Sequence, residues 1–170
     1  VTLLLLLNTG MRPEEMLAIR VGNITSDGNE TIISITSVLD RDGKTIKDYP
    51  KSDAGRRSLP VDDYTADTVR AWIELKSEMM RKMGLKPSMS MLVCGPEMIP
   101  RTYQSWHRDW MRFAAEAGFE GVRPYALRHT FATLNLANGE NIKPVAVLMG
   151  HASSAYTLDL YAAYVPNTGI

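Results

Sequence analysis

Several features that commonly reveal what a protein does are scarce in this sequence. Its 170 residues include a single cysteine, Cys94, so the chain cannot form an internal disulfide or a thiolate cluster for a metal. The 19 Lys and Arg residues balance 19 Asp and Glu residues, so no net charge draws the whole molecule toward nucleic acid. The longest purely apolar run, Leu3 to Leu7, is far shorter than the roughly 20 residues of a membrane span. We therefore expect a soluble protein of the reducing cytoplasm, with no membrane partner.

The common motifs of catalysis and metal binding are absent as well. The sequence has no GxxxxGK(S/T) phosphate loop, no HExxH, no EF-hand pattern and no GxSxG elbow. None of the three histidines, His107, His129 and His151, has a second histidine at the i+3 or i+4 spacing that places two metal ligands on one helix face. The sequence therefore predicts no metal and no other cofactor.

Apolar spacing predicts one domain of the α+β class, mainly α, over residues 1–170. Helices are expected over 13–19, 62–83, 102–117, 124–138, 143–149 and 157–164. Alternating β-branched residues at 31–38, 44–49 and 57–59 predict a small three-stranded antiparallel sheet. In the 62–83 helix, one apolar stripe is expected to lie in the core: Val69, Trp72, Ile73, Met79, Met80 and Met83. The opening VTLLLLLNTG has no initiating methionine, so we expect a fragment that starts inside a helix.

Five sequence blocks point to a function. They are TGMRPEE at 9–15, PKSDAGRRSLP at 50–60, YALRHTFAT at 125–133, LMGHAS at 148–153 and TLDLY at 157–161. In this order and at this spacing they resemble the catalytic domain of tyrosine recombinases, the phage-integrase family. The resemblance extends over about residues 2–165. It implies the helical catalytic fold of that family, with a separate N-terminal DNA-binding domain and the first part of the catalytic domain missing from the chain.

The resemblance assigns six candidate catalytic residues: Arg12, Lys51, Tyr125, Arg128, His151 and Tyr161. Arg12 and Arg128 would hold the phosphodiester, because planar guanidinium groups match two phosphate oxygens and keep their charge. His151 would add a third donor, and Lys51 would protonate the departing 5′ oxygen. Tyr161 would attack phosphorus and form a 3′-phosphotyrosine.

Tyr125 departs from the family pattern, which most often has histidine or lysine three residues before the arginine of the LRHT block. A phenol can donate a hydrogen bond to phosphate, but it accepts protons less readily than imidazole. This difference bears on the rate of the reaction more than on its type.

Other residues near the blocks have simpler interpretations. Glu15 is expected to be structural, as an anchor for an arginine or a first-turn carboxylate. Lys44 or Lys47 could be mistaken for Lys51, because hairpin turns shift alignments. Tyr164 is the rival nucleophile, whereas the TLxxY spacing favours Tyr161 and Tyr156 fits neither. We interpret His129 as structural and His107 as exposed or in contact with the DNA backbone.

The resemblance thus predicts a site-specific DNA recombinase or integrase of a mobile element. Its expected partners are double-stranded DNA, three further copies in a homotetramer on DNA, and accessory DNA-bending proteins. The location would be a prokaryotic cytoplasm, at the nucleoid when DNA is bound. The alternatives are a DNA-binding regulator that has lost strand exchange, a type IB topoisomerase-like enzyme, and a helical interaction module in which the blocks are accidental.

Overall fold

The computed structural model describes residues 1–28, 30–49, 53–95, 101–155 and 157–158. Two of the predicted catalytic residues, Lys51 and Tyr161, lie outside the described residues, and so do Tyr156 and Tyr164. In the part of the chain that is described, every helix is too short or too polar to cross a lipid bilayer.

The described residues form a mainly helical domain of the α+β class. Its helices are α1 (Thr2–Thr9), α2 (Pro13–Met16), α3 (Asp63–Lys82), α4 (Tyr103–Glu116), α5 (Pro124–Ala137) and α6 (Ile142–Met149). Side-chain oxygens of Asp62, Thr102 and Asn141 accept backbone N–H groups at the starts of α3, α4 and α6. Helix α2 ends earlier than predicted, because the amides of Ala18 and Ile19 bond three residues back in tighter turns.

The sheet has three antiparallel strands, as predicted, but not the three expected. Its order is β1 (Ile24–Ser26), β2 (Thr31–Ile35) and β5 (Arg57–Val61). The predicted 31–38 strand is divided at Thr36, and its second half, β3 (Ser37–Leu39), forms a separate hairpin with β4 (Ile46–Asp48). The 44–49 segment is therefore a strand of this hairpin and does not belong to the three-stranded sheet. The third strand of that sheet is instead β1, which sequence periodicity missed.

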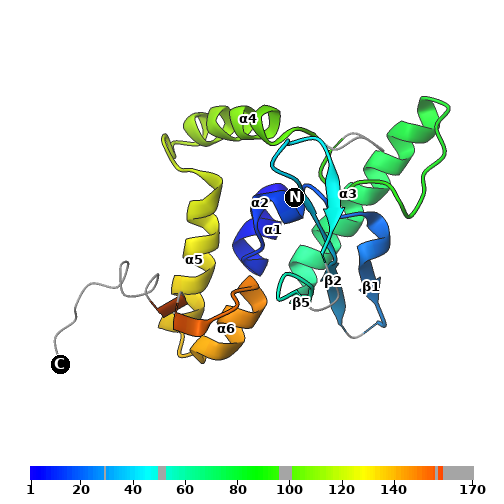
Figure 1. Cartoon of the computed structure of the whole chain (residues 1–170). Coiled ribbons are helices and arrows are strands. Elements are labelled where there is room, and N and C mark those ends of the chain that lie inside the picture. The colour runs from blue at the N-terminus through cyan, green and yellow to red at the C-terminus, as the bar shows by residue number, and fades with distance from the viewer. Residues whose placement is uncertain (29, 50–52, 96–100, 156, 159–170) are drawn as a thin grey trace, which may run out of the picture.

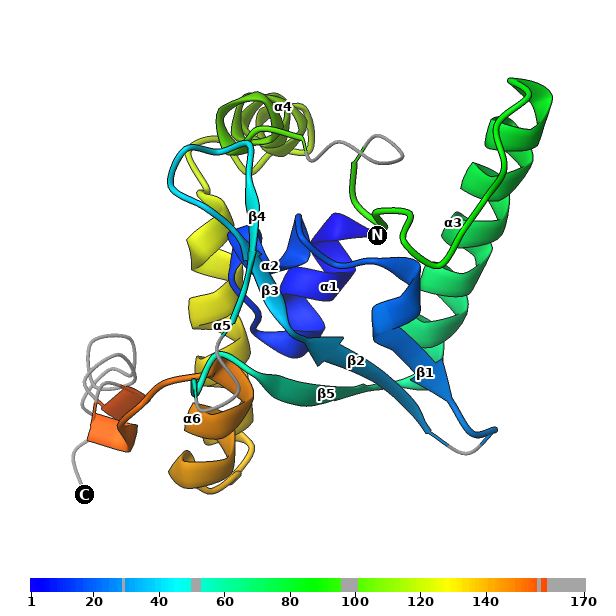
Figure 2. The same ribbon diagram turned by 45° about the vertical axis from the view of Figure 1, so that its right-hand side comes forward.

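Helix α1 lies in the middle of the molecule, with α5 on one side and the sheet and α3 on the other (Figures 1 and 2). Its buried Leu5 and Leu6 belong to the main core, together with Ile33 and Leu59 of the sheet and Trp106 of α4. A smaller apolar cluster joins α5 to α6 and contains Phe131, Ala132, Val145 and Met149. This arrangement brings the C-terminal ends of α1 and α6 close to Arg128 of α5, which donates to the carbonyl oxygens of Gly10 and Met149.

The expected apolar stripe of α3 is only partly buried. Val69 and Met80 are 2% and 4% exposed, but Trp72, Met79 and Met83 are 37%, 52% and 59% exposed. The prediction that the whole stripe lies in the core was wrong for these three residues. Helix α3 packs on α1 along part of its length and extends beyond it on one side of the domain (Figure 2). Apolar periodicity identified the helix, but it did not show which part of the helix is covered by neighbouring elements.

Gly10 ends α1 and sets the approach of α5. Its φ of 63° lies in the left-handed region, and its N–H donates to the carbonyl oxygen of Leu6, 3.2 Å away. A Cβ at this position would overlap the ring of Phe131 on α5. Glycine therefore fits both the backbone turn and the close packing of α5 against the end of α1.

Candidate active site

Arg12 is placed by the turn between α1 and α2. It directly precedes Pro13, the first residue of α2, and its backbone N–H donates to Oε2 of Glu15 at 2.7 Å. Its side-chain Nη1 donates to Oε1 of Glu15 at 2.9 Å, and Nη2 donates to the carbonyl oxygen of Gly150 at 3.1 Å. Burial alone would lower the pKa of Arg12, but the adjacent Glu15 carboxylate raises it. The guanidinium is thus a permanent cation, and 29% of its side chain is exposed.

Glu15 is a fully buried carboxylate between two arginines. Arg57 donates to its two oxygens at 2.9 and 2.8 Å, and the Tyr49 hydroxyl donates to Oε1 at 3.1 Å. Burial would raise the pKa of Glu15, but the hydrogen bonds and charges of Arg57 and Arg12 lower it. The predicted structural role of Glu15 agrees with these contacts, which fix Arg12 from one side.

Arg128 lies on α5 and is 4% exposed. Its Nη1 donates to the carbonyl oxygen of Gly10, and its Nη2 donates to that of Met149 at 2.7 Å. Nη2 also lies 2.8 Å from Nε2 of His151. Burial, followed by the charge of Arg12, lowers the pKa of Arg128 to about 10, which still leaves the side chain charged at neutral pH.

The hydrogen bonds of His151 define its tautomer. Because the arginine keeps its protons, the 2.8 Å contact makes Nε2 of His151 an acceptor. The ring proton is then on Nδ1, which lies 2.7 Å from Oγ1 of the fully buried Thr157. Burial, followed by the charges of Arg128 and Arg12, lowers the pKa of His151 to about 4. The imidazole is therefore neutral at physiological pH.

The carboxyl end of α6 holds three arginines. The carbonyl oxygens of Leu148, Met149 and Gly150 accept hydrogen bonds from Arg57 at 2.5 Å, Arg128 at 2.7 Å and Arg12 at 3.1 Å, respectively. These carbonyls have no partner within the helix and carry the negative end of its dipole. Gly150 itself has a φ of 68°, and a Cβ there would lie 2.8 Å from Nη1 of Arg57. A glycine at the helix end lets the guanidinium groups approach this closely.

Tyr125 lies in the first turn of α5, three residues before Arg128, and is 38% exposed. Its hydroxyl donates to Oε2 of Glu14 at 2.9 Å, which joins the start of α5 to α2. Burial and the neighbouring Glu14 carboxylate raise the pKa of Tyr125. The phenol is therefore protonated at neutral pH, and its proton is directed at Glu14.

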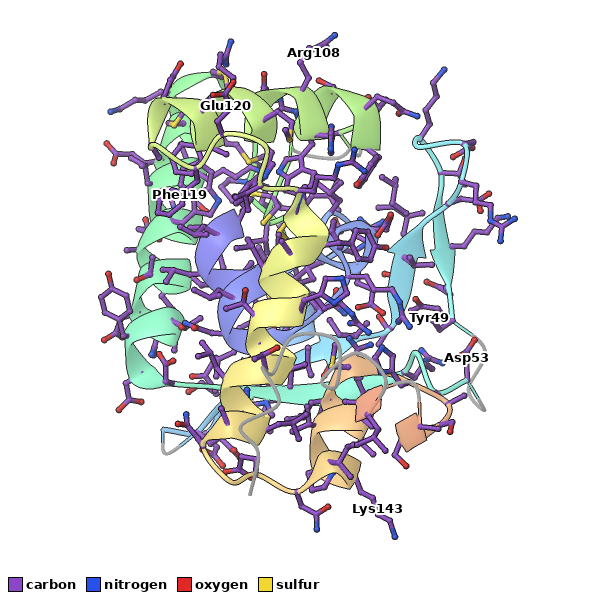
Figure 3. The ribbon with its side chains drawn as sticks, turned by 90° about the vertical axis from the view of Figure 1, so that its left-hand side faces the viewer. Tyr49, Asp53, Arg108, Phe119, Glu120 and Lys143 are labelled. Atoms are coloured by element: carbon purple, nitrogen blue, oxygen red, sulfur yellow. The ribbon has the colours of Figure 1, made fainter. Side chains whose placement is uncertain are left out.

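Four of the six predicted catalytic residues line one cavity of about 510 Å³: Arg12, Tyr125, Arg128 and His151. Asp53 also lines the cavity, and Figure 3 shows it on the same side of the domain as α6. Two other labelled cations, Arg108 and Lys143, point away from the domain at opposite ends. The cavity thus has two guanidinium groups, the imidazoles of His151 and His129, a phenol and the Asp53 carboxylate at its wall. This is an arrangement suited to one phosphate group.

Of the remaining candidates, His129 also lines the cavity, and the others lie apart from it or outside the described residues. Lys51 and Tyr161 lie outside the described residues, so their roles stay predictions. Lys47, the possible substitute for Lys51, pairs with Asp40 at 2.6 Å on the hairpin of β3 and β4. His107 lies on α4 with its ring centroid 5.7 Å from that of Tyr103. Among the residues the structure describes, no group of three or more His, Cys, Asp and Glu side chains is placed to hold a metal ion.

Two residues of the site were missed at the level of sequence. Glu14 and Thr157 appeared at the sequence level only as members of the TGMRPEE and TLDLY blocks. No local pattern pairs Glu14 with Tyr125, because 111 residues separate them. The sequence contained a weak indication of the contact between Thr157 and His151, because a threonine only six residues after a histidine can reach its ring if the chain turns between them.

A cavity of about 510 Å³ lined by two arginines, in a mainly helical domain with a small sheet, agrees with the expected class of DNA strand-transfer proteins, and the comparisons agree with this class as well. The phage integrase family matches residues 1–167. The chain belongs to the phage integrase family.

Curated relatives are tyrosine recombinases and integrases. The ICEBs1 integrase of Bacillus subtilis is 23% identical over 162 residues, which cover 94% of this chain and 43% of that protein. The tyrosine recombinase XerD of Agrobacterium fabrum is 30% identical over 159 residues, which cover 90% of this chain and 45% of that protein. The chain spans less than half the length of these curated relatives.

Solved structures share the fold. The Tn1549 transposon integrase in complex with transposon right end DNA aligns with a TM-score of 0.71 and 22% identity, covering 94% of this chain and 52% of that chain. The crystal structure of XerA recombinase aligns with a TM-score of 0.70 and 20% identity, covering 96% and 51%. The fold of this domain is that of a tyrosine recombinase catalytic domain.

Proposed function

We propose that this protein is a site-specific DNA recombinase or integrase that cuts and rejoins DNA through a 3′-phosphotyrosine intermediate. The observation that supports this most strongly is the convergence of Arg12, Arg128 and His151 on one cavity, although they come from the start of α2, from α5 and from the end of α6. A phosphodiester carries one negative charge, and attack by an oxygen nucleophile adds charge to its nonbridging oxygens. Fixed guanidinium groups stabilise that developing charge.

His151 takes part through a change of partner. In the DNA-free state its Nε2 accepts from Arg128, so it has no proton there to donate to phosphate. A phosphate that takes up the Nη2 donors of Arg128 releases Nε2. The hydroxyl of Thr157 can either accept from Nδ1–H or donate to a bare Nδ1, so the ring can carry its proton on Nε2 and become the third donor.

The rest of the proposed chemistry follows the family resemblance. Tyr161 attacks phosphorus, and Lys51 donates a proton to the 5′ oxygen that leaves. A different 5′ hydroxyl later attacks the phosphotyrosine and restores the DNA backbone. The reaction needs no metal and no other cofactor, because the arginines provide the charge that a metal ion would otherwise supply.

Double-stranded DNA is the proposed partner. The Tn1549 integrase and the XerH recombinase, which share this fold, were solved in complexes with DNA. We further propose a homotetramer on DNA for the protein at its full natural length, accessory DNA-bending proteins, and a cytoplasmic location at the nucleoid.

A DNA-binding regulator on the same fold is the second candidate. One observation favours it: the residue at the position usually held by histidine or lysine is Tyr125, whose proton is held by Glu14. A regulator would bind DNA through the same basic cavity without forming a covalent bond. A topoisomerase-like activity would share the covalent step but would relax DNA without exchanging strands.

Trapping the covalent intermediate tests the proposal. The full-length protein is incubated with nicked duplexes drawn from the DNA that flanks its gene, and the adduct is digested and its modified peptide identified by mass. We expect the nucleotide on Tyr161 and loss of the adduct in Tyr161→Phe with DNA binding intact. A Tyr164→Phe variant is the control and should keep the adduct. An adduct that survives Tyr161→Phe, or one attached at Tyr164, contradicts the assignment of the nucleophile.

A further inference from the structure

The chemistry proposed above gives no step to Tyr125 or to Glu14, the carboxylate that its hydroxyl contacts. Tyr125 lines the cavity, and its hydroxyl donates to Oε2 of Glu14 at 2.9 Å. Because the single phenolic proton is used in this bond, the side of the hydroxyl oxygen away from Glu14 presents lone pairs. Toward any group in the cavity, the phenol therefore acts as a hydrogen-bond acceptor.

The surroundings of the phenol keep it protonated. The charged and titratable side chains that act on it are Glu14 and Arg12 from the α2 region, and Tyr103 from α4. Burial is the largest cause of its raised pKa, followed by the charge of Glu14 and the hydrogen bond to it. A free phenolate is therefore not formed near neutral pH. A neutral phenol is also far too weak a base to hold a second proton, so alone it could not take one from a nucleophile.

We propose that Tyr125 and Glu14 act together as the proton acceptor for the attacking hydroxyl, with Glu14 acting through Tyr125; this rests on the function proposed above. The attacking O–H transfers its proton to Oη of Tyr125 as the Tyr125 proton moves to Oε2 of Glu14. The oxygen of the nucleophile forms a bond to phosphorus, and the bond from phosphorus to the 5′ oxygen breaks. That oxygen takes a proton from the general acid. The net change in the pair is one protonated Glu14 carboxyl group, and Tyr125 ends as a neutral phenol.

Two features of the structure suit this relay to a reversible reaction. Glu14 is partly exposed, so its proton can exchange with water between steps. In the rejoining step, the same path returns a proton to the tyrosine that leaves. The 2.9 Å bond already exists in the DNA-free protein, so the acceptor needs no rearrangement of α2 or α5.

The test is a double-mutant cycle on the rate of covalent adduct formation with nicked duplexes from the DNA that flanks the gene. Glu14→Gln and Tyr125→Phe should each lower the rate by about 100-fold, the typical contribution of one proton transfer. The double variant should be no slower than either single variant, because both changes interrupt one path. Glu140→Gln and Tyr64→Phe, an exposed carboxylate and an exposed phenol elsewhere, are the matched controls and should keep the wild-type rate.

Tyr125→His separates the relay from a merely structural bond. An imidazole can accept the proton itself, so in this background Glu14→Gln should change the rate by less than about 3-fold. Cleavage by Tyr125→His should also fall as the pH drops below about 6.5, where imidazole ordinarily gains a proton, while the wild-type protein keeps its rate at about pH 6. If Glu14 were only structural, Glu14→Gln would slow the Tyr125→His protein as much as it slows the wild-type protein.

The outcomes distinguish a failure of the relay from a failure of the proposed recombinase function. Additive effects of the two single changes, or a Glu14→Gln protein as fast as wild type, overturn the relay while leaving the recombinase function intact. Adduct formation by Tyr125→His but not by wild type also overturns it, because the native pair would then be unable to accept the proton. If neither protein forms an adduct, the proposed function fails and the relay fails with it.

Discussion

Arg57 and Glu15 form a two-point ion pair in which each carboxylate oxygen accepts from a different guanidinium nitrogen, at 2.9 and 2.8 Å. Glu15 is fully buried and the Arg57 side chain is 4% exposed. Removing one partner would leave the other charge buried without its match, which usually costs about 3–5 kcal/mol. The buried pair therefore fixes Glu15, which in turn holds Arg12, before any DNA is bound.

The first prediction follows from this pair. Glu15→Gln should lower the free energy of unfolding by about 3–5 kcal/mol, measured by urea titration with circular dichroism. Because the folded pKa of Glu15 is lowered, its contribution is complete above the ordinary carboxyl pKa of about 4.3 and is lost as the pH falls through the lowered value. Glu140→Gln on the surface serves as control, and an equal loss in both variants would contradict the prediction.

The second prediction separates a structural arginine from one that acts on DNA. Arg57→Ala should destabilise the fold by about 3–5 kcal/mol, since its side chain is buried against Glu15 and the end of α6. Arg12→Ala should cost less stability, because 29% of its side chain is exposed and Glu15 keeps Arg57. Adduct formation by Arg12→Ala should nevertheless fall by about 100-fold or more. An Arg12→Ala protein that is both stable and fully active would remove this arginine from the phosphate site.

The third prediction concerns stability in mild acid. His151 has a pKa of about 4 when folded, against an ordinary value of about 6.5, so between these values the unfolded chain binds a proton that the folded chain does not. Stability should be complete above about pH 6.5 and should fall as the pH drops toward about 4. His151→Gln should reduce this slope in urea unfolding compared at about pH 7 and about pH 5. Some slope should persist, because burial and Arg128 also lower the pKa of His129. An unchanged slope would contradict the neutral state of His151.

The fourth prediction tests the packing at the end of α1. Gly10→Ala should destabilise the domain more than Gly139→Ala, although both glycines have a positive φ, of 63° and 88°. A Cβ on Gly139 would meet nothing within 4 Å, so this change should show only the backbone cost of about 1–2 kcal/mol. Gly10 adds the overlap with Phe131, for which overpacking costs about 1–3 kcal/mol more. Equal losses in thermal or urea unfolding would mean that the ring moves aside freely.

The sequence predicted the helices of the described residues well, because each begins or ends at a residue with a strong local preference, such as Asp62, Thr102 or Gly150. The expected 157–164 helix lies largely outside the described residues and stays a prediction. The sheet was predicted less accurately, since strand partners depend on contacts between segments far apart. Residues 31–38 alternate as one strand, yet the chain divides at Thr36 and its two halves pair with different partners. Likewise, Met79 and Met83 fit an apolar stripe, but no local signal says where the neighbouring elements stop covering α3.

In the candidate site, too, the sequence revealed local features but not the contacts between distant segments. The family resemblance pointed to Arg12, Arg128 and His151, and the structure brings them to one cavity. It could not identify Glu14 as the partner of Tyr125, because their contact is made only when α2 and α5 meet. Residue types suited to a chemistry are visible in a sequence, whereas the hydrogen bonds that set their protonation require the folded arrangement.

The carbonyl groups at the end of α6 have a mechanical consequence. Arg12, Arg57 and Arg128 come from three different elements, yet each is tied to one of three successive residues of this single helix end. A shift of α6 by a fraction of a helical turn would break these three hydrogen bonds together, whereas Glu15 would still hold Arg12 and Arg57. Any movement of α6, whether caused by a neighbouring segment or by a bound duplex, would change the contacts of all three arginines at once.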